Sequence, residues 1–85
     1  MQDSIKLFNI PQYIACSERE QMIKILEEVA EVENELDRNN RDRKLLVGEV
    51  ADLLQTVWTL SQILKIAPEE MTESLEVKFT ERKLI

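Results

Sequence analysis

The sequence predicts an all-α protein with two long antiparallel helices followed by a C-terminal helix. Apolar residues recur at three- and four-residue steps over two long stretches, approximately residues 18–38 and 43–65. The chain has one glycine and two prolines, and 44% of its residues are hydrophobic, which is typical of a packed helical protein. Residues 1–85 form one domain with a core too small for comfortable stability alone, so we expect a homodimer or homotetramer.

The N-terminal part, residues 1–16, shows the weakest periodicity. We expect it to be irregular or to form a short helix over about Asp3–Phe8. Ser17 followed by Glu20 matches a capping box, in which each residue's side chain bonds the other's backbone N–H. This signal opens the first long helix, which we expect to continue to about Arg38.

Two further helices follow from capping signals. Residues 39–40 are two asparagines that break the first helix, and Asp42 is a candidate N-cap for a second helix over roughly Arg43–Lys65. Pro68 suits the first turn of a third helix. The cationic side chains of Arg82 and Lys83 are favourable near the negative, C-terminal end of that helix.

The charge and composition exclude several classes of function. A net charge of -6 argues against nucleic acid or an anionic membrane as a partner, because both require a basic surface. Charges interrupt every apolar run, so we expect no membrane span. The single Cys16 excludes an intrachain disulfide framework, and the N-terminus has no secretion leader, so the cytoplasm is the expected compartment.

Acidic residues form two groups with helical spacing, Glu27-Glu28-x-x-Glu31 and Glu49-x-x-Asp52. Positions three apart lie on the same side of a helix, so each group presents its carboxylates together. If the two long helices pack side by side, four carboxylates converge and repel one another. Because the chain has no histidine, an oxygen-binding divalent cation is the expected partner, with Mg²⁺ the first candidate and Mn²⁺ a substitute.

A simpler interpretation is that these acids form solvated faces of an acidic protein, which is what most charge runs do. For either group alone, that interpretation is preferred because glutamate is a good helix former. The two groups together favour a metal site, because they lie at the edges of apolar stripes on helices joined by a short turn.

The paired acidic groups resemble those of the MazG-like, all-α nucleoside triphosphate pyrophosphohydrolases, and Lys78-Phe79-x-x-Arg82 resembles the basic motif near the C-terminal end of that family. The resemblance covers roughly Lys24 to Arg82. It implies a MazG-like helical bundle that hydrolyses a nucleotide substrate, releasing nucleoside monophosphate and pyrophosphate. The alternatives are phosphoribosyl-ATP pyrophosphatase, which has the same fold, and a non-catalytic acidic interaction module.

The resemblance also implies a role for individual residues. Glu27 would be the catalytic residue that orients or deprotonates the attacking water. Lys78 and Arg82 would contact substrate phosphates. The implied magnesium ligands are Glu28, Glu31, Glu49 and Asp52.

Lys24 lies one helical turn before Glu28 and has two possible roles. Its ammonium group could bind a phosphate of the substrate, or it could form an ordinary i to i+4 ion pair with Glu28. The ion pair is the preferred interpretation because such pairs are common on helices.

Overall fold

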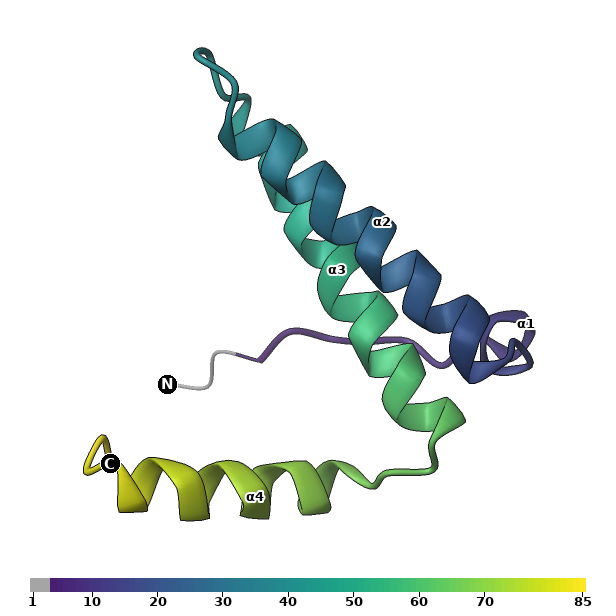
Figure 1. Cartoon of the computed structure of the whole chain (residues 1–85), viewed down its shortest axis with the longest axis vertical. Coiled ribbons are helices and arrows are strands. Elements are labelled where there is room, and N and C mark those ends of the chain that lie inside the picture. The colour runs from purple at the N-terminus through teal and green to yellow at the C-terminus, as the bar shows by residue number, and fades with distance from the viewer. Residues whose placement is uncertain (1–3) are drawn as a thin grey trace.

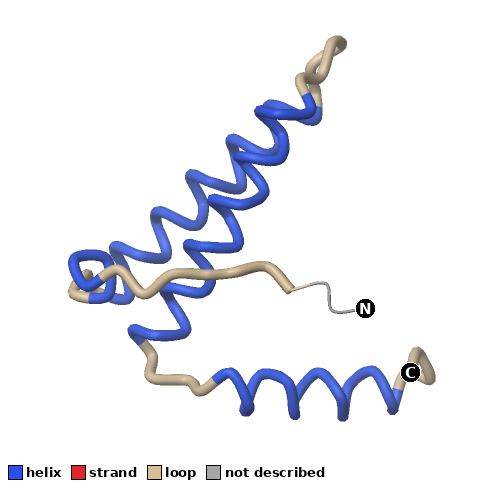
Figure 2. Tube along the Cα trace, turned by 180° about the vertical axis from the view of Figure 1, so that it is seen from behind, coloured by secondary structure: helices blue, strands red, loops and turns tan. Residues whose placement is uncertain are grey.

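The computed structural model describes residues 4–85, which form four α-helices (Figure 1). These are α1 (Pro11–Ile14), α2 (Glu18–Leu36), α3 (Arg43–Ile63) and α4 (Pro68–Glu81). No strand occurs among these residues (Figure 2), so the prediction of an all-α fold is confirmed. Within the same range, no helix has both the length and the apolar composition that crossing a membrane requires.

The long helices α2 and α3 run antiparallel and lie side by side along most of their length (Figure 1). The predicted capping box opens α2: Glu20 N donates to Ser17 Oγ at 3.1 Å, and Ser17 N donates to Glu20 Oε1 at 2.9 Å. The helix ends at Leu36 rather than at about Arg38, because the chain leaves helical geometry to form the turn into α3.

Acidic side chains fix the turn between α2 and α3. Asp42 caps α3 as predicted, since its Oδ1 accepts from the backbone N–H groups of Lys44 and Leu45 at 2.9 and 3.3 Å. Glu35 is only 5% exposed, and it accepts from Arg38 Nη1 at 3.3 Å and from the Asp42 backbone N–H at 3.4 Å. Glu35 therefore stabilises the turn and is not available to a metal site.

The N-terminal segment differs from the short helix expected over Asp3–Phe8. Asp3 lies outside the described residues, and residues 4–10 are not helical. Their backbone instead bonds α3: Phe8 N donates to Gln55 Oε1 at 2.9 Å, and Gln55 Nε2 donates to Phe8 O at 2.8 Å. The only helix here, α1, begins at Pro11, where the missing N–H is no loss. We call residues 4–10 the N-terminal strap.

The last helix, α4, points away from the α2–α3 pair and makes no extensive contact with either helix (Figures 1 and 2). The change of direction occurs at Lys65, which has a φ of 58°. There, the Ile66 N–H donates to Ser61 O at 2.9 Å, which closes the end of α3 two residues before the expected Lys65. The expected C-terminal helix is present, but it does not pack on the long pair.

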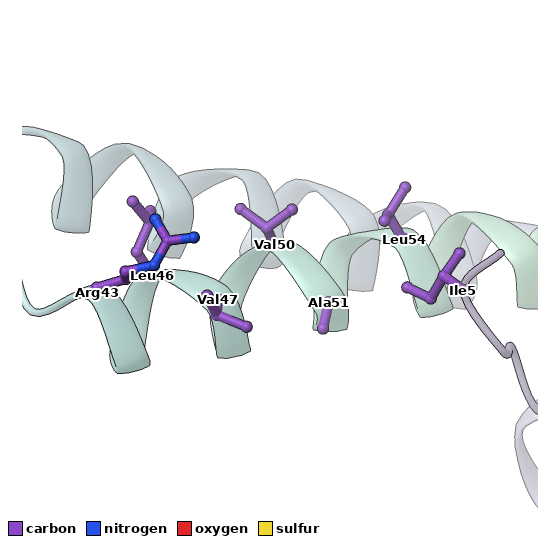
Figure 3. Close-up of a pocket in the computed structure, with 7 residues that line it drawn as sticks. All are labelled: Ile5, Arg43, Leu46, Val47, Val50, Ala51 and Leu54. Carbon is purple, nitrogen blue, oxygen red and sulfur yellow. The ribbon is translucent and has the colours of Figure 1, made fainter. Parts of the chain in front are cut away.

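Much of the apolar surface of this chain is uncovered. Ile25 is the one buried hydrophobic side chain among residues 4–85, whereas Val57 and Leu26 are 47% and 58% exposed. The outer face of α3 carries a groove of about 340 Å³ (Figure 3). The lining residues are Ile5, Arg43, Leu46, Val47, Val50, Ala51 and Leu54.

Candidate functional site

Carboxylates from α2 and α3 meet where the antiparallel helices lie side by side. Glu28 and Glu31 lie one turn apart on α2, and Glu49 comes from α3. One carboxylate oxygen from each of the three side chains lies within 4.8 Å of the other two. The structure therefore brings together three of the four expected metal ligands.

Two of these carboxylates carry an oxygen that has no partner in the protein. Oε2 of Glu28 and Oε2 of Glu49 are both buried and accept no hydrogen bond. Glu28 and Glu49 are half-buried, while Glu31 is exposed. A buried acceptor left without a donor destabilises the fold, and more so when it is charged. The three carboxylates are therefore unfavourable as neighbours unless a proton or a metal cation neutralises their charge.

The pKa values of Glu28 and Glu49 also reflect the crowding of negative charge. The pKa of Glu28 is raised, first by burial and then by the nearby charges of Glu31 and Asp52. The pKa of Glu49 is also raised, first by a side-chain hydrogen bond with Glu31 and then by burial. Both effects favour the protonated acids, because the folded chain holds these negative charges close together.

The donor set fits a hard divalent cation. All three groups offer carboxylate oxygens, the ligands that Mg²⁺, Mn²⁺ and Ca²⁺ prefer. Opposite oxygens around Mg²⁺ are separated by about 4 Å, and the three carboxylate oxygens all lie within 4.8 Å of one another, so small side-chain rotations would bring them to a shared ion. The unpartnered Oε2 atoms therefore support a cation site.

The other two expected acids lie next to this cluster. Asp52 is exposed, and its charge contributes to the raised pKa of both Glu28 and Glu49. Glu27 is exposed, and its charge makes the smallest contribution to the pKa of Glu28. Neither acid belongs to the group whose carboxylate oxygens lie within 4.8 Å of one another, but Asp52 lines the same pocket as Glu28.

Lys24 does not form the ion pair with Glu28 that the sequence favoured. Its Nζ lies over the ring of Tyr13, 4.7 Å from the ring centroid, an arrangement in which the ring face attracts the cation. Within residues 4–85, the one ion pair that forms joins Arg38 and Glu35. The cation of Lys24 is therefore left unneutralised beside the acidic cluster.

A polar pocket of about 240 Å³ adjoins the cluster. Glu28, Asp52 and Lys24 contribute to its wall, so the pocket and the cluster share Glu28. The complete lining is Tyr13, Gln21, Lys24, Glu28, Asp52, Gln55, Thr56 and Thr59. A ligand in this pocket would therefore touch the acids at one end. We call it the amide pocket, after its two glutamines.

Sequence reasoning missed most of the amide pocket. Gln21 and Thr59 are each 1% exposed, although both are polar. A signal was present: Gln21 lies two turns before Glu28 on α2, and Thr59 lies two turns after Asp52 on α3. Polar residues on the buried side of two paired helices indicate a polar cavity between them.

The basic residues expected to contact phosphate lie elsewhere. Lys78 is in α4 and Arg82 follows its last turn, and α4 is separate from the α2–α3 pair that carries the acids (Figure 1). Both side chains are exposed. Within one chain, the structure does not bring these cations to the acidic cluster.

Comparison with known families identifies one match. A family model described as the MazG nucleotide pyrophosphohydrolase domain matches residues 17–84. The match includes both acidic groups, all but one of the amide pocket residues, and α4. No curated protein and no solved structure has significant similarity to the chain.

Proposed function

Because the chain belongs to the MazG nucleotide pyrophosphohydrolase family, we propose that it hydrolyses a nucleoside triphosphate to the monophosphate and pyrophosphate in the presence of Mg²⁺. The observation that carries this proposal is the convergence of Glu28, Glu31 and Glu49 within 4.8 Å. The two unpartnered Oε2 atoms of Glu28 and Glu49 support it further.

Four carboxylates would hold the metal in this proposal. Glu28, Glu31 and Glu49 form its centre, and Asp52 joins them from one turn further along α3. Mn²⁺ would substitute for Mg²⁺, because both bind carboxylate oxygen. When bound, the metal would neutralise charge on the phosphates and help to align an attacking water.

Glu27 would act on the water. It is exposed and adjacent in sequence to Glu28, so its carboxylate is not needed to complete the centre. A carboxylate outside the metal ligands is able to orient a water molecule and accept its proton. Glu27 is therefore our proposed catalytic residue.

Lys24 and the amide pocket would bind the nucleotide. The pocket shares Glu28 with the acidic cluster and is also lined by the neighbouring Asp52, so a molecule with its phosphates at the acids would extend into it. Lys24 lies at this junction with its charge unpaired and its Nζ held by Tyr13. A lysine in this position would neutralise a phosphate oxygen.

Lys78 and Arg82 would reach the phosphates from a second copy of the chain. In the α4 of one protomer, Leu75 and Val77 are 49% and 53% exposed, and a helix of this length is marginal in water without packing partners. The uncovered groove on α3 (Figure 3) is a surface where another copy could bury such a helix. We therefore propose a homodimer or homotetramer in which α4 completes the site of its neighbour.

The test of the function is a pyrophosphate-release screen over ribonucleotides, deoxyribonucleotides and phosphoribosyl-ATP, with Mg²⁺ and with a chelator. We expect release from at least one nucleoside triphosphate and none with the chelator present. Release from phosphoribosyl-ATP alone would assign the chain to that narrower activity. No release from any nucleotide, in a folded protein that binds metal, would leave a non-catalytic interaction module and overturn the proposal.

A further inference from the structure

Gln21 presents a buried hydrogen-bond acceptor at the wall of the amide pocket. The side chain is 1% exposed, and its Nε2 donates to the backbone carbonyl of Thr56 at 2.9 Å. Because a carbonyl oxygen only accepts hydrogen bonds, this contact fixes which end of the amide carries the nitrogen. Oε1 of Gln21 is left buried without a partner. The pocket wall therefore requires a donor that the protein does not supply.

The position of Gln21 matches one end of a bound nucleotide. Gln21 and Thr59, both 1% exposed, form the inner wall of the pocket, whereas Lys24 and Asp52 are exposed at its outer part. Gln21 lies two helical turns, about 10 Å, from Glu28 along α2. A nucleoside whose phosphates lie at the acids has a comparable length, so its base would extend toward Gln21.

The other amide in the pocket is already committed to other partners. Gln55 accepts from the backbone of Phe8 through Oε1, and its Nε2 donates to Phe8 O and to Thr59 Oγ1. The hydroxyl of Thr56 donates to Leu53 O in its own helix. Of the two glutamine side chains in the pocket wall, only Gln21 has an oxygen, Oε1, without a hydrogen-bond partner. The chemistry of that wall favours a ligand that donates a hydrogen bond.

We propose that the amide pocket binds the nucleobase and that Oε1 of Gln21 accepts a hydrogen bond from an exocyclic amino group. Cytosine and adenine carry such a group opposite the glycosidic bond, whereas uracil, thymine and guanine carry a carbonyl oxygen there. A carbonyl would face Oε1 with both acceptors unpaired, which disfavours binding. The inference rests on the proposed function for the nucleotide and adds the class of base.

The first test uses the unaltered protein. Steady-state kinetics would compare CTP with UTP, dCTP with dUTP, and ATP with ITP, pairs in which an amino group is replaced by a carbonyl. We expect kcat/KM to favour the amino base by about 10- to 100-fold in at least one pair. Equal values within every pair would show that water, not a base, satisfies Gln21, and would overturn the inference.

The second test removes the acceptor. Gln21→Met keeps a side chain of similar length without polar atoms, and we expect it to abolish the preference by slowing only the amino-base substrates. Thr56→Val is the matched control, because it alters the same pocket wall but leaves Oε1 of Gln21 in place, and it should keep the preference. A preference that survives in a folded Gln21→Met protein would overturn the inference.

Equilibrium binding separates this inference from the proposed function. Calorimetry would use α,β-methylene analogues of CTP and UTP, which cannot release pyrophosphate. If no nucleotide is hydrolysed but the cytosine analogue binds more tightly, the base assignment stands while the hydrolase proposal falls. If hydrolysis occurs and the two analogues bind equally, the base assignment alone falls. A Gln21→Met protein that fails to fold leaves these unaltered-protein comparisons to decide.

Discussion

Glu28 on α2 and Glu49 on α3 point carboxylate oxygens toward each other within 4.8 Å, and each keeps a buried Oε2 atom without a partner. The two carboxylates repel each other across the contact between the two helices, so stability alone does not explain why they lie there. A protein that maximised its stability would place apolar or oppositely charged side chains here.

Removing one acid of this pair should separate function from stability. We expect Glu49→Gln to reduce kcat/KM and metal affinity by at least about 100-fold, since even residues that only support metal ligands are worth 10- to 100-fold. Metal affinity would be measured by titration with Mn²⁺. Glu33→Gln, which alters an exposed acid on the paired helix α2 outside the cluster, is the matched control. Unchanged turnover in Glu49→Gln would rule out the proposed metal centre.

The metal-free protein should become less stable as pH rises. Burial of Glu28, and the hydrogen bond of Glu49 with Glu31, raise the pKa of both acids above their ordinary value of 4.5. The folded chain therefore binds their protons more tightly than the unfolded chain, so the unfolding free energy falls between pH 4.5 and the raised pKa values. We expect the Tm of the metal-free protein to decrease over this window, and Mg²⁺ to restore it at neutral pH.

One control accompanies the pH measurement. In a protein carrying both Glu28→Gln and Glu49→Gln, the Tm should no longer fall as the pH rises through this window. Glu20 acts in the opposite sense, because the Ser17 cap lowers its pKa, but its contribution is lost only as pH falls below the ordinary carboxyl value. A Tm of the metal-free protein that rises through the same window would contradict the assignment.

Lys24 should affect nucleotide binding but not metal binding. Because its ammonium group lies over Tyr13 and pairs with no acid, Lys24→Met should raise KM by about tenfold while leaving Mn²⁺ affinity in the absence of nucleotide unchanged. Lys65→Met, which alters an exposed lysine in the turn after α3, is the control for lost charge. If metal affinity changes as much as KM, then Lys24 acts through the acids and not on the phosphate.

Mixing two inactive variants would test whether α4 acts in its neighbour. Glu49→Gln lacks a metal ligand, and the double variant Lys78→Ala, Arg82→Ala lacks the basic residues of α4. In a mixed dimer, the intact α4 of the first protomer would serve the intact acids of the second. Random mixing should then restore about one quarter of the normal rate, because half of the dimers hold one working site.

The outcome depends on denaturing and refolding the two variants together so that protomers exchange. Each variant treated alone should stay inactive, and the native protein treated in the same way gives the reference rate. Mixtures that exchange protomers but remain inactive would show that each α4 serves its own chain. Light scattering would establish in the same samples whether the protein is dimeric or tetrameric.

Gly48 offers a prediction about stability. It lies within α3, and an added Cβ would meet no atom within 4 Å. We expect Gly48→Ala to stabilise the fold by about 1 kcal/mol, because glycine is costly inside a helix, and to raise Tm by about 5 °C. Thermal melts at several protein concentrations would measure this. A destabilisation that grows with concentration would place Gly48 in an interface between copies.

Local sequence signals were sufficient for the three longer helices, α2, α3 and α4, and for the acidic cluster. The capping box at Ser17 and the N-cap at Asp42 depend on residues within one turn, and both form. The acids at Glu28 and Glu49 follow from helix periodicity once the two helices are paired by a short turn. Such features need no knowledge of contacts far apart in the chain.

The features that the sequence did not predict depend on long-range contacts. The N-terminal strap is extended because Gln55, on a distant helix, satisfies the backbone of Phe8, and no local pattern encodes that pairing. Lys24 was expected to pair with Glu28 one turn away, but Tyr13 from α1 attracts its cation instead. The direction of α4 depends on one backbone angle at Lys65, which helix periodicity does not specify.

Gln55 couples ligand binding in the amide pocket to the attachment of the N-terminal strap. Its Oε1 accepts from the Phe8 N–H, and its Nε2 donates both to Phe8 O and to the Thr59 hydroxyl in the pocket wall. A ligand that binds more tightly to the ordered wall would therefore also hold the strap in place. Because linked equilibria are reciprocal, removing the strap would lower the affinity for that ligand by the same factor. Slower hydrogen exchange at the Phe8 amide would make this linkage measurable far from the acids.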